Sequence, residues 1–152
     1  MAKRHRSLAL FILLVVGIGW TIGATNLPGA WYAGLQKPPF NPPNLVFAPT
    51  WTVLYVMIAV AGWRTYLQEE TTALPMQLWL AQMILNFLWS PVFFTLHHMT
   101  FALAIILTLL AVIAGFIWVQ WDENRVAAGL FIPYAVWVAF ASVLNYSIYR
   151  LN

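Results

Sequence analysis

Apolar residues are grouped along this chain in five long runs, which are separated by polar or proline-rich links. Each run holds about 20 residues with few charged side chains, the length that an α-helix needs to cross the hydrocarbon core of a bilayer. The predicted helices are about Leu8–Leu27, Val46–Tyr66, Met76–Leu96, Thr100–Trp121 and Val126–Tyr149. The pattern therefore predicts an all-α integral membrane bundle of five transmembrane helices, with residues 1–152 forming a single membrane domain.

The composition supports a membrane protein, because 62% of the residues are hydrophobic and only 7% are charged. Soluble domains contain about 25% charged residues. The net charge of +3 comes from scattered residues, so nucleic-acid binding is not indicated. The chain has no cysteine, which excludes disulfides, thiolate catalysis and cysteine-ligated metals. Basic residues precede the first run, as in a signal peptide, but the run exceeds the roughly 7–15 apolar residues of one. We therefore predict a retained membrane helix.

The basic residues also predict an orientation. With five crossings, the N-terminus and the second and fourth links share one side of the membrane. That side holds five of the seven basic residues, namely Lys3, Arg4, Arg6, Arg64 and Arg125. The opposite side holds Lys37 and Arg150. Because basic residues favour the cytoplasmic side, we predict for a bacterial inner membrane a cytoplasmic N-terminus and an outward C-terminus.

The first link, about residues 28–45, is unusually long and rich in proline. Links in helical bundles usually have about 2–8 residues, and longer ordered loops are often functional lids. The stretch LQKPPFNPPNLVFAPTW contains five prolines, each of which fixes φ and removes a backbone donor. We predict a compact lid with little secondary structure, followed by a helix that starts at Pro43.

Three polar, uncharged residues follow one face of the third predicted helix. Gln82, Asn86 and Ser90 are spaced four residues apart and therefore form one stripe. Polar side chains are costly against lipid, so we predict that the stripe faces the interior of the bundle. There the residues either form hydrogen bonds between helices or act as polar anchors of a ligand cavity. Spacing alone favours the hydrogen bonds.

Several tryptophans lie too far from the predicted helix ends to be anchors at the membrane surface. These are Trp51, Trp89 and Trp137, the last of which shares a helix face with Ala141, Leu144 and Asn145. Aromatic walls with a few polar groups suit a flat hydrophobic ligand.

Two weaker patterns allow more than one interpretation. Leu144, Tyr146 and Arg150 match a pattern proposed for cholesterol contact, but a tyrosine–arginine anchor at the interface explains the same residues more simply. Gly19 and Gly23 form a small-xxx-small pair that favours close packing of a helix or a dimer.

The ionisable residues argue against two classes of function. All four acidic residues fall in predicted links, whereas proton-coupled pumps usually keep a carboxylate or histidine within the membrane. His97 and His98 are adjacent and on a helix point about 100° apart, so they are poorly placed to share one metal ion. We interpret them as a polar turn at the membrane surface and predict no metal site.

Three longer motifs resemble a known family. AWYAGLQKPPFNPPNLVFAPTWTVLY, LNFLWSPVFF and WVAFASVLNYSIYR occur in this order and resemble the tryptophan-rich sensory protein family, also called the translocator protein or peripheral benzodiazepine receptor family. The resemblance extends from about Leu27 to Arg150 and indicates a bacterial-type member. Phe40 stands where many bacterial relatives carry tryptophan, and Tyr149 and Leu151 replace residues common in animal members.

The resemblance implies a five-helix bundle, often a homodimer, with a pocket beneath the first link. In the family this pocket binds porphyrins such as protoporphyrin IX, synthetic isoquinoline and benzodiazepine-type ligands and, in mitochondrial members, cholesterol. The implied ligand-binding residues here are Tyr32, Pro42, Phe47, Trp51, Asn86, Trp89, Trp137, Ala141 and Leu144. The implied partners are a porphyrin or another flat hydrophobic ligand and the bilayer, with a sterol as a further candidate, and no cofactor is implied.

The resemblance favours a membrane binding protein or sensor for tetrapyrroles, with transport of these ligands or its regulation as a further role. The alternative is a light-dependent enzyme that degrades bound porphyrin oxidatively. The sequence supplies no acid or thiol for such chemistry, so its candidate catalytic residues are Trp51 and Trp137, as electron donors. A transporter without intramembrane charge or an internal repeat would have to be passive or driven by a partner.

Overall fold

The computed structural model describes residues 2–68 and 73–152, with side chains from residue 4 onward. The chain forms the helices α1 (Ala2–Thr25), α2 (Ala30–Gly34), α3 (Asn44–Gln68), α4 (Leu74–Ser90), η1 (Pro91–Thr95), α5 (Met99–Glu123) and α6 (Arg125–Leu151). Five of the described helical segments, with α4 and η1 counted as one, are long and apolar enough to cross a membrane. The predicted all-α bundle of five membrane helices is therefore confirmed.

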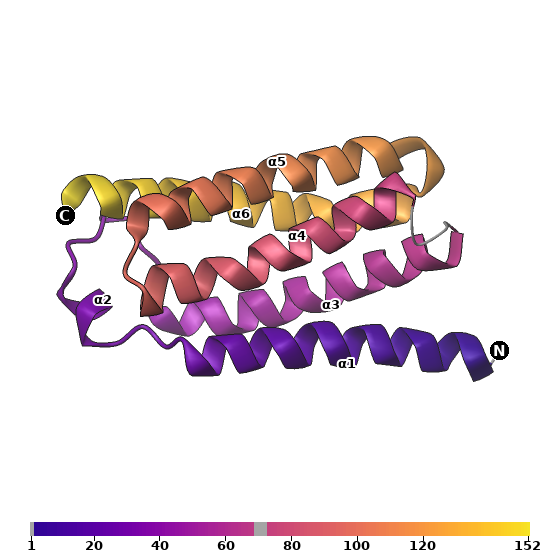
Figure 1. Cartoon of the computed structure of the whole chain (residues 1–152), viewed down its shortest axis with the longest axis horizontal. Coiled ribbons are helices and arrows are strands. Elements are labelled where there is room, and N and C mark those ends of the chain that lie inside the picture. Colours follow the sequence, from indigo (N-terminus) through magenta and orange to yellow (C-terminus); the bar gives the residue numbers. More distant parts are fainter. Residues whose placement is uncertain (1, 69–72) are drawn as a thin grey trace.

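The helices lie side by side with alternating direction (Figure 1), and short links join η1 to α5 and α5 to α6. α6 packs against α5 and α3, and α4 packs against α5. α1 lies at the edge of the bundle, mainly against α3, and only 11% of its apolar stretch is buried, compared with 33% for each of the other spans. Most of the α1 surface therefore lies on the outside of the bundle.

The third predicted helix differs from the prediction at its end. It continues as an α-helix only to Ser90, and residues Pro91–Thr95 form a π-helical turn, η1. Proline at position 91 has no N–H to donate to the preceding turn, which disturbs the regular α-helical ladder. Wider turns of this kind are frequent at functional sites. After η1, His97 has a φ of 57°, and the chain turns back into α5.

The proline-rich link lies at the same end of the bundle as the C-terminus, opposite the N-terminus (Figure 1). It contains the short helix α2, so the prediction of little secondary structure is only partly correct. The predicted start of the second helix at Pro43 is one residue early, because α3 begins at Asn44. The Pro43 carbonyl accepts a hydrogen bond from the backbone N–H of Val46 at 3.0 Å.

The link is fastened to the last residue of the chain. The side-chain amide of Asn152 accepts from the backbone N–H of Gln36 and donates to its carbonyl, both at 2.9 Å. It also donates to the carbonyl of Ile148 in α6 at 2.8 Å. The side-chain amide of Asn152 therefore forms with the Gln36 backbone the two hydrogen bonds that an adjacent β-strand would form, and it connects the link to the end of α6.

Candidate ligand-binding site

Aromatic rings from α3 and α6 meet at the interface between these helices. The ring of Phe47 lies edge-on to that of Trp137, with centroids 5.8 Å apart. Trp51 lies 5.4 Å from Tyr55 and 6.3 Å from Tyr134. Three of the predicted site residues, Phe47, Trp51 and Trp137, thus belong to this aromatic cluster.

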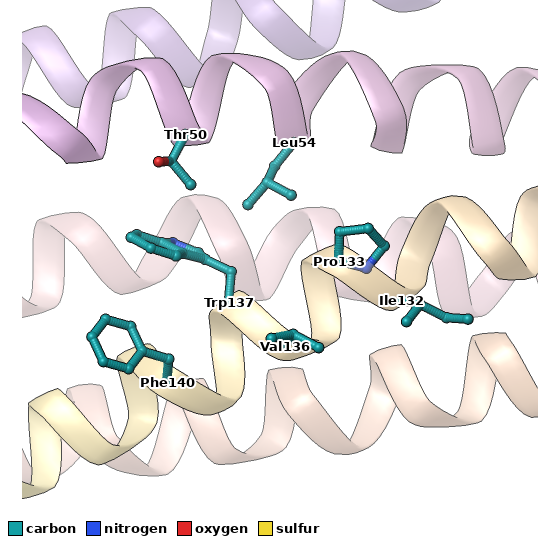
Figure 2. A pocket seen from close by; sticks show the side chains of 7 residues that line it. All are labelled: Thr50, Leu54, Ile132, Pro133, Val136, Trp137 and Phe140. Atoms are coloured by element: carbon teal, nitrogen blue, oxygen red, sulfur yellow. The ribbon is translucent and has the colours of Figure 1, made fainter.

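A groove with a volume of about 650 Å³ runs beside the cluster, between α3 and α6 (Figure 2). Figure 2 shows the Trp137 side chain projecting from α6 toward Thr50 of α3. Its lining residues are Thr50, Leu54, Ile132, Pro133, Val136, Trp137 and Phe140. Only Trp137 was predicted as a site residue. The other six follow helical spacing, but in a membrane protein that spacing is shared with every lipid-facing stripe, so the sequence carries no signal that separates them.

The indole N–H of Trp137 has no hydrogen-bond partner although the nitrogen is buried. Leaving a buried donor unpaired costs about 1–3 kcal/mol. The ring itself is held by aromatic contacts, including one to Phe140 at 5.7 Å. The aromatic cluster therefore offers apolar ring surfaces, and it contains one buried donor that no protein group satisfies.

The predicted polar stripe on α4 forms a hydrogen-bonded chain through the bundle. The Tyr55 hydroxyl donates to Asn86 Oδ1 at 3.3 Å, and Asn86 Nδ2 donates to the Tyr134 hydroxyl at 2.7 Å. The Tyr134 hydroxyl donates to Gln82 Oε1 at 2.9 Å. Gln82 and Asn86 are buried, as predicted, while Ser90 is half-buried. Of the two interpretations of the stripe, these bonds favour hydrogen bonding between helices.

The chain of hydrogen bonds reaches the aromatic cluster through its two tyrosines. Trp51 contacts the rings of both Tyr55 and Tyr134. Asn86 is therefore separated from the aromatic cluster's surface by these tyrosine rings and does not lie beside Trp137. Gln82 Nε2 is buried without a partner at the far end of the chain. The amides of Gln82 and Asn86 therefore fix the positions of the rings that a ligand would contact.

A second aromatic group lies under the proline-rich link. Tyr32 of α2 contacts Phe93 and Phe94 at 6.2 and 5.3 Å, and Trp89 stacks on Phe93 at 5.1 Å. Trp89 also donates from Nε1 to Asn145 at 3.1 Å. Two further predicted residues, Tyr32 and Trp89, are thus brought together here, and Trp89 borders both buried clusters of the bundle.

The phenol of Tyr32 is held in its neutral form. Burial raises the pKa of Tyr32, and its hydrogen bond to Asn41 offsets part of that increase. The hydroxyl donates to Asn41 Oδ1 at 3.4 Å. The ammonium of Lys37 lies 4.5 Å from the centre of the Tyr32 ring and donates to the Leu35 carbonyl at 3.1 Å. A cation is therefore fixed at the lid end of the bundle.

The remaining predicted residues have different surroundings. Pro42 and Ala141 are half-buried, and Ala141 packs against the main core. Leu144 is buried, whereas Tyr146 and Arg150 are exposed. Of the cholesterol pattern, Tyr146 and Arg150 thus lie on the outer surface, and Leu144 faces the interior.

The histidines at the end of the third span are exposed. The ring of His97 stacks on Trp31 with centroids 4.1 Å apart, and His98 precedes the first residue of α5. Among the described residues, no group of three His, Cys, Asp or Glu side chains is arranged to hold a metal ion.

Comparison with known proteins supports the resemblance found in the sequence. The TspO/MBR family matches residues 10–150. The chain is 36% identical to the tryptophan-rich sensory protein of Cereibacter sphaeroides, over 96% of this chain and 92% of that protein. It is 35% identical to the translocator protein of Sus scrofa, over 95% of this chain and 89% of that protein. For the tryptophan-rich protein TspO of Archaeoglobus fulgidus the identity is 34%, over 95% and 94%. The chain is an integral multi-pass membrane protein and belongs to the TspO/MBR family.

Proposed function

We propose that the protein is a membrane binding protein and sensor for tetrapyrroles of the protoporphyrin IX type. The observation that carries the proposal is the unpaired indole N–H of Trp137 within an aromatic cluster. A porphyrin offers a large flat ring system for contact with Phe47, Trp51 and Trp137, and it has acceptor atoms for a single donor. The family membership supports a sensory or binding role, since relatives are named as sensory and translocator proteins.

The lid end of the bundle supplies a second element of recognition. Lys37 is fixed above Tyr32, on the side of the membrane where the proline-rich link covers the bundle. A porphyrin carries carboxylates at one edge of its ring. With the ring against the aromatic cluster, this edge would face the lid, where an ammonium group stabilises negative charge.

The proposal is tested by titrating the purified protein with protoporphyrin IX in the dark and following tryptophan fluorescence. We expect saturable quenching in the wild type. Trp137→Phe keeps an aromatic ring but removes the indole N–H donor. Because a hydrogen bond from this donor to the ligand would contribute about 0.5–1.5 kcal/mol, the Kd should rise roughly two- to tenfold.

Trp118→Phe is the matched control, because Trp118 is 84% exposed on α5 and contributes to neither aromatic group. It should leave the affinity unchanged. Absence of saturable quenching in the wild type would refute the proposed function. Equal affinities of Trp137→Phe and Trp118→Phe would refute the assignment of the site.

We also propose that the N-terminus is cytoplasmic. The starts of α1 and α6 and the end of α3 share one end of the bundle (Figure 1), and that end carries Arg4, Arg64 and Arg125. Because the chain has no native cysteine, single cysteines introduced at either end can be labelled with an impermeant reagent in intact cells. Labelling at the N-terminal end from outside would contradict the orientation. Dimerisation, implied by the resemblance, stays a prediction that cross-linking in membranes tests.

A further inference from the structure

We propose that the groove between α3 and α6 is a lateral entrance, through which a hydrophobic ligand passes between the bilayer and the aromatic cluster, with the side chain of Trp137 as its gate. This inference rests on the proposed function and specifies the route by which the ligand reaches its site. The alternative route leads from water, beneath the proline-rich link.

The depth of the groove is the first argument. α6 has 27 residues and is therefore about 40 Å long. The lining residues Ile132 to Phe140 begin seven positions after Arg125, so they lie roughly 10–22 Å along the helix. A bilayer has a hydrocarbon core about 30 Å thick. The groove thus opens at the level of the acyl chains.

The chemistry of the lining is the second argument. Six of the seven residues are apolar or aromatic, and the hydroxyl of Thr50 already donates to the Val46 carbonyl at 2.8 Å. Two helices alone supply the lining, so the third side of the groove faces the surroundings of the bundle. A wall of this kind admits a neutral ring system but offers nothing to water or to a charged group.

The freedom of Trp137 is the third argument. Other tryptophans in the bundle are fixed through their indole N–H, as Trp79 is to the Ile58 carbonyl at 2.9 Å and Trp89 to Asn145 at 3.1 Å. Trp137 has no such bond and lies between the groove and Phe47. Rotation of its side chain therefore breaks no hydrogen bond and joins the groove to the aromatic cluster.

Both walls of the groove contain a proline within a helix. Pro49 lies in α3 next to Thr50, and Pro133 lies in α6 among the lining residues. Each removes one hydrogen bond of its helix and favours bending there. At the lid end, Phe140 contacts Phe40 of the proline-rich link at 6.4 Å. A porphyrin moving sideways through the groove would thus keep its carboxylate edge at the level of the lid while its ring stays in the hydrocarbon.

The test measures the rates of protoporphyrin IX binding and release in phosphatidylcholine proteoliposomes, by porphyrin emission. Val136→Phe narrows the groove at a residue that is 66% exposed, so the bundle has room for the larger side chain. Val143→Phe is the matched control on the same helix, outside the groove and 53% exposed. We expect Val136→Phe to slow association and dissociation alike, by about tenfold, a change of barrier height that leaves the Kd unaltered.

Three results would overturn the inference. Rates of Val136→Phe equal to those of Val143→Phe would show that the groove is not on the route. A raised Kd with unchanged association would make the groove a binding surface and not a passage. Faster exchange in Asn152→Ala, which releases the link, together with unchanged rates in Val136→Phe would place the entrance under the lid.

A second readout separates failure of the entrance from failure of the proposed function. Phosphatidylcholine with brominated acyl chains quenches tryptophans that the hydrocarbon can reach, and the Trp137 contribution is obtained by difference from Trp137→Phe. If the wild type does not bind porphyrin, the proposed function fails. The opening of the groove to the bilayer is then tested by this quenching. We expect the quenching of Trp137 to decrease in Val136→Phe and to stay unchanged in Val143→Phe. Equal quenching in Val136→Phe and Val143→Phe would refute its opening to the bilayer.

Discussion

Gly19 is the position at which α1 approaches the buried ring of Tyr55, and alanine there should destabilise the bundle. An added Cβ would overlap the ring, since it would lie 2.7 Å from Tyr55 Cζ and 2.8 Å from Cδ2. Carbon atoms in contact are about 3.5 Å apart, and Cε2 of the ring is closer still to the added Cβ, so the ring or the helix must move by roughly 1 Å. The Tyr55 hydroxyl donates to Asn86 Oδ1 at 3.3 Å, so movement of the ring would disturb that bond, whereas movement of α1 would loosen its packing against α3.

The magnitude follows from three contributions. Overpacking of this kind costs about 1–3 kcal/mol, and loss of a hydrogen bond between membrane helices costs about 0.6 kcal/mol. Alanine regains up to about 1 kcal/mol of helix propensity over glycine. We therefore expect Gly19→Ala to lower the free energy of unfolding by about 1–3 kcal/mol.

Gly17 and Gly23 in the same helix provide matched controls, because a Cβ at either position meets no atom within 4 Å. Gly17→Ala and Gly23→Ala should be neutral or stabilising by up to about 1 kcal/mol. The assay is thermal unfolding in detergent, followed by near-ultraviolet circular dichroism. For a chain of this size, 1 kcal/mol corresponds to about 2–4 °C in Tm. A Tm of Gly19→Ala at or above that of Gly17→Ala would refute the close-packing argument.

Three further predictions concern polar groups. Tyr134→Phe leaves Asn86 with an unpaired donor and should destabilise the bundle by about 1–3 kcal/mol, measured by the same unfolding assay; an unchanged Tm would contradict the importance of the buried chain. Asn152→Ala removes both bonds to Gln36, so amide hydrogen exchange should accelerate in the proline-rich link while the Tm changes little; unaltered exchange would argue that the pairing does not hold the link. Asn124 accepts from the third residue of α6 as its N-cap, and Asn124→Ala should cost about 0.5–2 kcal/mol, whereas Asn124→Asp should retain most of the stability.

The membrane helices were predictable because a single physical requirement fixes them. Every backbone polar group in hydrocarbon must be paired internally, so a run of about 20 apolar residues has essentially one solution. The ends were less predictable: α1 extends back to Ala2, since polar residues continue a helix readily at the membrane surface. The π-helical turn at Pro91 was missed because a proline near a helix end equally allows a kink or a stop.

The interior face of α4 was predictable in direction but not in partners. Spacing placed Gln82 and Asn86 on the buried side, yet nothing local indicates that Tyr55 and Tyr134 complete their hydrogen bonds from two other helices. The two glycines of the small-xxx-small pair in α1 likewise have different surroundings in the structure. Gly19 lies against Tyr55, whereas a Cβ at Gly23 would meet no atom within 4 Å.

The candidate site was predicted mainly through the family resemblance. It gave Phe47 and Trp137, whose rings meet, and Trp51, which contacts the tyrosines of the same helix interface. It also gave Tyr32 and Trp89, which belong to a separate group under the link. The groove beside Trp137 was not foreseen. An apolar residue that faces lipid and one that lines a groove follow the same pattern along a helix, and only the tertiary arrangement distinguishes them.

The π-helical turn also determines how this segment tolerates changes in length. Such a turn holds about one residue more than an α-helical turn, so a single deletion within Pro91–Thr95 would convert it to an α-helical turn while the residues after it keep their direction. His97, on which the lid ring of Trp31 rests, would therefore still face the lid. A chain shortened by one residue here would keep its five membrane helices and this contact with the lid, whereas a deletion within a regular α-helical turn rotates the residues after it by about 100°.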